Sequence, residues 1–369
     1  MFSKRILAVA AAGCAALAGF AVTPFAEAAT GRAVTALTYD LGDTAFPIPD
    51  SDGAAELRGV VRFPSRLPAG KLPLVLLLHG QNRSCALTEG DATWPCPAGV
   101  PEFPSYRGYD YLGEALARDG FVVVSIAAGG INHFMGVSPQ RAALINKHLA
   151  LWERFTSTGG GDLAGRFTDL ATGRAAKPPL RGHVDLTRVG TLGHSVAGEG
   201  VMRHASDKYR GDWPPGVRVR GVVPIASRYF NYDNIDDDGV SPDRDVSGVL
   251  VTGMPFAVVS ATCWGSGDEA YFRNARGRTQ QPAFLVRLVA GNHNHFNTVW
   301  SDATDFPNGD DSTCPADPRR PSAQAQRDFA VTYLRAFYRM ALKGDHSGEP
   351  VLTGARSVPG VNTEHEHLP

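Results

Sequence analysis

The run LPLVLLLHG, residues 72–80, constrains the fold of this chain more than any other stretch. It is apolar at almost every position, whereas a strand with one face in water alternates apolar and polar residues. Such a run predicts a strand that is buried on both faces, as in a parallel sheet that helices cover on each side. Further strands are predicted at residues 121–127, 188–195, 218–227, 255–263 and 282–291.

Segments with helical spacing separate these runs. Residues 139–155 begin near a proline and place four apolar side chains on one face: Ile145, Leu149, Trp152 and Phe155. Residues 109–120 and 322–342 are also predicted as helices, and residues 55–63 as an early strand. Buried strands that alternate with helices predict an α/β domain with a mostly parallel central sheet and helices on both faces. One domain is expected over residues 30–369, with loops inserted at 81–108, 157–187, 228–253 and 301–321.

Residues 1–29 have the features of a secretory signal peptide. Lys4 and Arg5 precede a long apolar stretch, and Ala26-Glu27-Ala28 offers a cleavage site near Ala28/Ala29. A lipoprotein acylated on Cys14 is the less favoured alternative. No later run is apolar over the ~18 residues of a membrane span, so we expect a secreted, extracellular protein without stable membrane insertion. The net charge of -1 argues against a nucleic-acid partner.

Cleavage of the signal would leave four cysteines in an oxidising compartment, where an even number favours disulfides. Their proximity along the chain favours the pairs Cys85–Cys96 and Cys263–Cys314. A zinc site is the rival interpretation, but the chain has no C-x-x-C spacing and the cysteines are scattered. Two disulfides are therefore predicted.

The segment VGTLGHSVAGEG, residues 189–200, places Ser195 between a strand and an Ala/Gly-rich helix start. A nucleophilic serine on a sharp strand-to-helix turn needs small neighbours, and Gly193, Ala197 and Gly198 provide them. The usual pattern is G-x-S-x-G, from which Ala197 departs. We predict Ser195 as a nucleophile; a structural serine in a tight turn is the alternative.

A serine hydroxyl needs a general base, and its partners follow in the order acid, then histidine, each after a later strand. His293 comes directly after the run at 282–291 and is the predicted base, with His295 as the alternative. Asp268 follows the run at 255–263 and is the predicted acid, with Asp233 as the alternative. Glu199, close behind the serine, is a third candidate acid.

Acyl transfer also needs donors directed at the developing oxyanion. The run at 72–80 ends in His79-Gly80, so the backbone N–H of Gln81 is a predicted donor. The N–H of Val196, the residue after the nucleophile, is the other.

The His79-Gly80 turn, the GHSVAGEG segment and the histidine loop AGNHNHFN together resemble the α/β-hydrolase superfamily. Within it they are most similar to secreted bacterial esterases of the lipase, cutinase and polyester-hydrolase kind. The resemblance spans roughly residues 55 to 342. It implies the α/β-hydrolase fold and the site residues Ser195, His293, Gln81 and Val196. It also implies hydrolysis of carboxylic esters through an acyl-enzyme, without a metal or cofactor. The loop CWGSGDE departs from the pattern because no aspartate lies close behind its strand.

Two weaker patterns complete the sequence. Residues 234–245 resemble a calcium loop, with candidate ligands Asn234, Asp236, Asp238 and Asp245; a solvated acidic turn is the favoured interpretation. Aromatic residues also fall in or near the loops that would carry the site. They are predicted either to line an apolar pocket or to anchor their loops: Trp94, Phe103, Tyr106, Trp264, Phe296 and Trp300.

The sequence thus predicts a secreted serine hydrolase of small-molecule or polymeric esters, with lipid, cutin-like or polyester substrates. An amidase or peptidase with the same triad is one alternative. A binding protein on a hydrolase scaffold without catalytic activity is the other.

Overall fold

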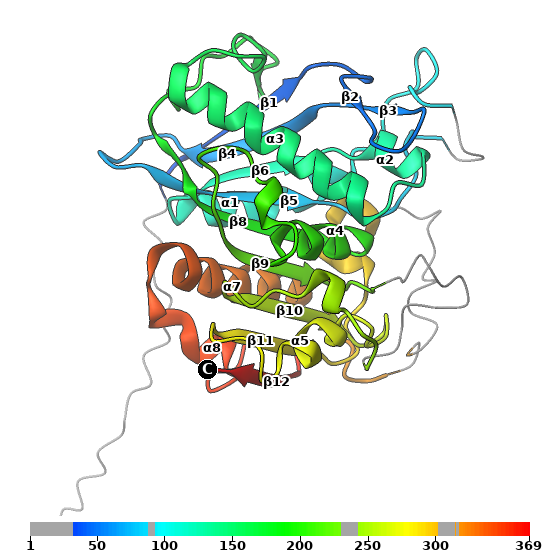
Figure 1. Ribbon diagram of the computed structural model, residues 1–369, viewed down its shortest axis with the longest axis vertical. Helices are drawn as coiled ribbons and strands as arrows, with labels where there is room; N and C mark the ends of the chain where they lie inside the picture. The colour runs from blue at the N-terminus through cyan, green and yellow to red at the C-terminus, as the bar shows by residue number, and fades with distance from the viewer. Residues whose placement is uncertain (1–31, 88–92, 230–242, 302–313, 315–316) are drawn as a thin grey trace, which may run out of the picture. The chain divides into compact units, whose positions relative to one another are not determined.

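The apolar runs lie side by side in one sheet of the computed structural model, which describes residues 32–87, 93–229, 243–301, 314 and 317–369. In this part of the chain the sheet has ten strands, in the order β12-β11-β10-β9-β8-β5-β6-β4-β1-β7 (Figure 1). The six neighbours from β11 to β6 are parallel, and the edge strands β12, β4, β1 and β7 are antiparallel to their neighbours. The predicted α/β class with a mostly parallel sheet is confirmed.

The strands of this sheet are β1 Val34–Asp40, β4 Arg58–Pro64, β5 Leu72–Leu78, β6 Val122–Ile126, β7 Phe167–Asp169, β8 Val184–His194, β9 Val219–Ile225, β10 Phe256–Ala261, β11 Ala283–Leu288 and β12 Thr363–Leu368. A separate hairpin joins β2 Phe46–Pro47 to β3 Ala54–Ala55. The α-helices are α1 Asp110–Arg118, α2 Gly129–His133, α3 Ser138–Thr158, α4 Val196–Ala205, α5 Glu269–Ala275, α6 Thr298–Ser301, α7 Ala323–Lys343 and α8 Glu349–Leu352.

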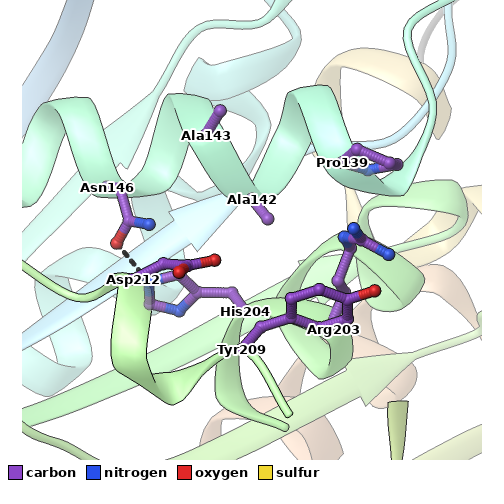
Figure 2. Close-up of a pocket in the computed structure, with 8 residues that line it drawn as sticks. All are labelled: Pro139, Ala142, Ala143, Asn146, Arg203, His204, Tyr209 and Asp212. Atoms are coloured by element: carbon purple, nitrogen blue, oxygen red, sulfur yellow. Dashed lines mark hydrogen bonds between the residues drawn. The ribbon is translucent and has the colours of Figure 1, made fainter. Parts of the chain in front are cut away.

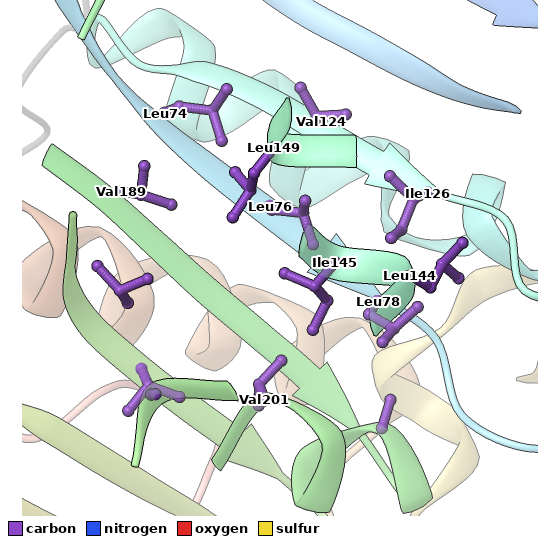
Figure 3. Packing of buried hydrophobic residues seen from close by; sticks show 14 of the residues in the cluster. Leu74, Leu76, Leu78, Val124, Ile126, Leu144, Ile145, Leu149, Val189 and Val201 are labelled. Carbon is purple, nitrogen blue, oxygen red and sulfur yellow. The ribbon is translucent and has the colours of Figure 1, made fainter. Parts of the chain in front are cut away.

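Helices cover both faces of the sheet, and strand β5 contributes to the core on each side. Its residues Leu74, Leu76 and Leu78 belong to the cluster that includes residues of α3, α4 and α5, as Figure 3 shows in part. The alternate residues Val75 and Leu77 belong to a second cluster with residues of α1 and α7. Both sides of β5 exclude water, which explains why its sequence has no polar alternation.

The predicted helices correspond to α1, α3 and α7, and the predicted strands to β5, β6, β8, β9, β10 and β11. The early strand is shorter than predicted, since residues 55–63 divide between β3 and β4. The segment 157–187, predicted as a loop, contains β7 and the first residues of β8. The polar edge strand β12 was not predicted, because its sequence TEHEHL gives no apolar signal.

Both predicted disulfides are present, Cys85–Cys96 and Cys263–Cys314, with Cα–Cα distances of 5.7 and 5.5 Å. They use all four cysteines of the predicted mature chain, so the zinc alternative is wrong. The predicted signal peptide at 1–29, including Cys14, lies outside the described residues. Within the described ranges, no helix is both long enough and apolar enough to cross a bilayer.

Candidate active site

Ser195 occupies a sharp turn between the end of β8 and the start of α4. Its backbone has φ 58° and ψ -134°, a combination that residues other than glycine rarely adopt. The side chain is 5% exposed. Such strain at a single serine is typical of a functional site, because a merely structural turn would favour glycine or asparagine there.

Glycines leave the space that this turn requires. A Cβ on Gly193 would overlap the carbonyl oxygen of Ala197, and one on Gly198 would overlap the Ser227 side chain. A Cβ on Gly80 would lie 2.5 Å from Cβ of Ser195, so the His79-Gly80 turn after β5 approaches the serine directly. Ala197 itself is fully buried, which means that the structure accommodates a methyl group where the usual pattern has glycine.

The predicted base His293 lies in the loop after β11, on the same edge of the sheet as Ser195. Gln326 of α7 holds this loop by accepting a hydrogen bond from the Asn292 N–H at 3.0 Å and donating one to the Asn292 carbonyl at 2.6 Å. The Asn292 side chain in turn accepts from the backbone N–H groups of Asn294 and His295. The loop is therefore fixed to a core helix on one side of His293.

The imidazole of His293 is oriented by its Nδ1 atom, which lies 2.9 Å from Oδ1 of Asn294. An amide oxygen accepts only, so this contact places a proton on Nδ1 and leaves Nε2 as the basic nitrogen. The sequence did not identify Asn294 as a residue that contacts the base. Its position directly after His293 was the only available signal.

Two of the predicted aromatic residues, Trp264 and Trp300, pack against the His293 ring. The Trp264 ring centroid lies 4.1 Å from that of His293, and the Trp300 ring is stacked at 5.8 Å and 16°. Trp94 and Phe103 have other neighbours, since the Trp94 indole donates to the Asp43 carbonyl and the Phe103 ring lies beneath Arg83. The tryptophans give the imidazole an apolar setting with little surrounding water.

His194, the last residue of β8, directly precedes Ser195. It is fully buried, and its Nε2 donates to the carbonyl oxygen of His293 at 3.0 Å while Nδ1 accepts from the Tyr109 hydroxyl at 2.8 Å. Burial holds the pKa of His194 well below its usual value. The residue before the serine therefore ties the histidine loop to the β8 strand end.

Asp268 follows β10, which lies between β9 and β11, so its backbone is on the expected edge of the sheet. Its Oδ2 accepts from the Ser227 N–H at 3.3 Å, and its buried Oδ1 has no hydrogen-bond partner among the described residues. Burial raises the pKa of this carboxyl to about 8. None of the described hydrogen bonds joins Asp268 to His293. The neighbouring Glu269 carboxylate accepts two hydrogen bonds from the Arg287 guanidinium, at 2.6 and 2.7 Å.

The remaining acid and metal candidates are less informative. Asp233 and the calcium candidates Asn234, Asp236 and Asp238 lie outside the described residues. Asp245 accepts a hydrogen bond from the Ser247 N–H at 2.8 Å. Glu199 is buried in the first turn of α4. Over the described ranges, no group of three or more His, Cys, Asp or Glu side chains is arranged to hold a metal ion.

Of the two predicted oxyanion donors, Val196 directly follows Ser195, and Gln81 follows Gly80, which lies against Ser195. Val196 is the first residue of α4, and the N–H groups of a first turn have no acceptor within their own helix. Gln81 is next to Gly80, and its N–H donates to no other described residue. Its side chain is directed elsewhere, because Nε2 donates to the Asn132 carbonyl at 3.0 Å.

A cavity of about 310 Å³ lies apart from these residues, between α3 and the end of α4 (Figure 2). It is lined by Pro139, Ala142, Ala143, Asn146, Arg203, His204, Tyr209 and Asp212. His204 is engaged by Asn146 at 2.9 Å, and Arg203 stacks on Tyr209 at 3.8 Å. None of the predicted site residues lines this cavity.

No protein-family model matches the chain. A comparison with curated proteins also finds no relative.

Proposed function

We propose that this protein is a serine hydrolase of the α/β-hydrolase superfamily that cleaves carboxylic esters through an acyl-enzyme. The observation that carries the proposal is the backbone of Ser195, at φ 58° between a parallel strand and a helix. The same edge of the sheet carries His293 after β11 and the Gly80-Gln81 turn after β5. A strained serine, a histidine and free N–H groups on one edge are the parts that acyl transfer needs.

In the proposed reaction, Oγ of Ser195 attacks the ester carbonyl carbon while Nε2 of His293 takes the hydroxyl proton. The negative charge that develops on the carbonyl oxygen is stabilised by the N–H groups of Gln81 and Val196. His293 then returns the proton to the leaving alcohol as the C–O bond breaks, which leaves an acyl group on Ser195. Water, deprotonated by His293, attacks the acyl carbon, and the proton passes back to Oγ as the acid is released.

Asn294 Oδ1 supports this sequence because it keeps the proton of the neutral imidazole on Nδ1. Asp268 is the proposed acid of the triad, and above its raised pKa of about 8 its carboxylate stabilises the imidazolium. Its buried Oδ1, which has no described partner, is consistent with an oxygen that accepts when the charge on His293 develops.

The proposed setting is extracellular. Two disulfides suit an oxidising compartment, and the predicted signal peptide would direct export. The tryptophans beside His293 favour esters with an apolar part, such as lipid, cutin-like or polyester substrates.

The test compares p-nitrophenyl esters of short and long acyl chains, hydrolysed by the parent protein and by Ser195→Ala. Parent activity that disappears in the variant is the expected result. Matched anilides separate an esterase from an amidase or peptidase with the same triad. A parent protein that hydrolyses neither esters nor anilides would contradict the proposal and favour a binding protein on this scaffold.

A further inference from the structure

The peptide group between Gly80 and Gln81 contains both a carbonyl oxygen and the proposed oxyanion donor. In a trans peptide the C=O and the following N–H point in opposite directions in one plane. Whatever fixes the Gly80 carbonyl therefore fixes the direction of the Gln81 N–H. Because Gly80 lies against Ser195, a rotation of this peptide would move the donor relative to the reacting carbonyl.

Two side chains hold the Gly80 carbonyl. His79 contributes Nδ1 at 2.9 Å, and Asn132 contributes Nδ2 at 3.1 Å. The Ala128 N–H donates to Nε2 of His79 at 2.9 Å, so Nδ1 carries the ring proton and donates to Gly80. Burial lowers the pKa of His79 to about 3, which keeps this tautomer neutral over the ordinary pH range.

Asn132 also holds the next residues of the turn. Its Nδ2 donates to the Asn82 carbonyl at 3.2 Å, and its backbone carbonyl oxygen accepts from Nε2 of Gln81 at 3.0 Å. One side chain therefore holds the carbonyls on both sides of Gln81. Asn132 is 1% exposed, so water does not compete for these contacts.

The direction of the Asn132 amide is itself determined by a buried cation. Nη2 of Arg141, from α3, donates to Oδ1 of Asn132 at 2.7 Å. This contact requires an oxygen, which leaves the NH₂ group of Asn132 directed at the two carbonyls. At the other end of α2, Glu56 accepts from the N–H groups of Gly129 and Gly130 at 2.5 and 2.9 Å. The short helix that carries Asn132 is thus fixed at both ends.

We propose that Asn132 is a positioning residue of the oxyanion hole, which acts by fixing the Gly80–Gln81 peptide, with Arg141 fixing Asn132. This inference rests on the proposed function. Asn132 touches neither Ser195 nor the reacting carbonyl in this scheme, so its loss weakens transition-state stabilisation without removing a catalytic group. Binding of the ground-state ester is affected much less.

The test measures kcat and KM for Asn132→Asp and Asn132→Ala on an ester that the parent protein hydrolyses. Asn132→Asp keeps the shape but presents an acceptor oxygen to two carbonyl oxygens, so it is expected to lower kcat about 100-fold. Asn132→Ala is expected to lower kcat about 10-fold. Both decreases in kcat are smaller than or comparable to the decrease caused by removing an oxyanion donor. KM is expected to change less than about 3-fold.

A second measurement separates positioning from a general loss of structure. An alkyl boronic acid, which forms a tetrahedral adduct on serine, is expected to bind each variant more weakly by the same factor by which kcat/KM falls. Asn274→Ala is the matched control, because Asn274 Nδ2 also holds two backbone carbonyls, those of Arg244 and Ala270. This variant is expected to keep kcat, KM and boronate affinity.

The outcomes are distinguishable from those of the proposed function. A parent protein without ester hydrolysis or boronate binding would overturn both. A parent protein with normal activity, together with Asn132 variants whose kcat and boronate affinity are unchanged, would overturn the positioning role alone. If the Asn132 variants do not fold, Arg141→Lys tests the same link and is expected to lower kcat about 3- to 10-fold with KM unchanged; an unchanged kcat would contradict it.

Discussion

The two sides of the site differ in how firmly the structure holds them. On the β5 side, the Gly80–Gln81 peptide is held by His79 and Asn132 through buried hydrogen bonds. On the β10 side, Asp268 accepts from the Ser227 N–H at 3.3 Å and interacts with the Ser260 side chain, and its buried Oδ1 has no hydrogen-bond partner among the described residues. In the proposed reaction, the hydrogen bonds on the β5 side would hold the Gln81 N–H in place before substrate binds. On the β10 side, Oδ1 of Asp268 would be available to accept a hydrogen bond as charge develops in the proposed reaction.

The largest expected effect concerns the base. His293→Ala is expected to lower kcat by about 10⁵- to 10⁶-fold, because the serine loses its proton acceptor. His295→Ala is the matched control from the same loop and is expected to retain activity within about 3-fold. Steady-state ester hydrolysis measures both. Equal losses in the two variants would mean that the loop as a whole, and not His293, is required.

The next largest effect distinguishes Asp268 from Asp233 as the acid of the proposed triad. Asp268→Asn is expected to lower kcat by about 10⁴-fold, as loss of a triad acid does, whereas Asp233→Asn is expected to have little effect. The opposite order for the two aspartates would assign the acid to Asp233.

Asn294→Ala removes the acceptor at Nδ1 of His293 and is expected to lower kcat about 10-fold.

The same carboxyl predicts a dependence of stability on pH. Burial raises the pKa of Asp268 from 3.8 to about 8, so between these values the folded state binds more protons than the unfolded state. The contribution of Asp268 to stability is therefore fully present below pH ~4 and is lost as pH rises towards ~8. Asp268→Asn is expected to remove this loss. The gain in unfolding free energy above pH 8 is at most on the order of 6 kcal/mol.

Denaturant titrations of both proteins at pH 5 and pH 9 measure this effect. The variant should gain stability relative to the parent as pH rises. An unchanged difference between the two proteins at the two pH values would mean that Asp268 is ionised in the folded state already at pH 5.

Removing each disulfide is expected to have the smallest effect, and the two losses of stability can be compared directly. Cys263–Cys314 closes a longer stretch than Cys85–Cys96, with sequence separations of 51 and 11 residues. Loop-closure entropy predicts a loss of about 4 kcal/mol for Cys263→Ser with Cys314→Ser, and about 3 kcal/mol for the other pair. Chemical denaturation of the two double variants measures the difference, and a larger loss from the shorter loop would reverse the expected order.

The sequence predicted those parts of the fold that depend on local pattern. The doubly buried strand β5 and the amphipathic helix α3 are examples, because their apolar periodicity follows from which faces lose water. Strand β12 was missed, since a polar edge strand is selected by pairing with β11 rather than by its own residues. Ser195 and His293 could be located from the sequence because each directly follows a predicted strand.

The hydrogen bonds that connect the residues of the site could not be predicted from the sequence in this way. Asn132 contacts Gly80 and Asn82 across about 50 residues of sequence, and His194 reaches the carbonyl of His293 from a different strand. Nothing in a local pattern distinguishes these polar residues from solvated ones. Only the assembled sheet, which brings the ends of β5, β6, β8 and β11 to one edge, determines their partners.

The central claim is that Ser195 is an activated nucleophile, and covalent labelling tests it most directly. The protein is incubated with a fluorophosphonate, and the modified residue is located by peptide mass spectrometry, with Ser195→Ala and heat-denatured protein as controls. A single adduct on Ser195 of the folded parent protein is expected, with none in either control. A folded parent protein that takes no label, or that carries the label on another serine, would contradict the claim.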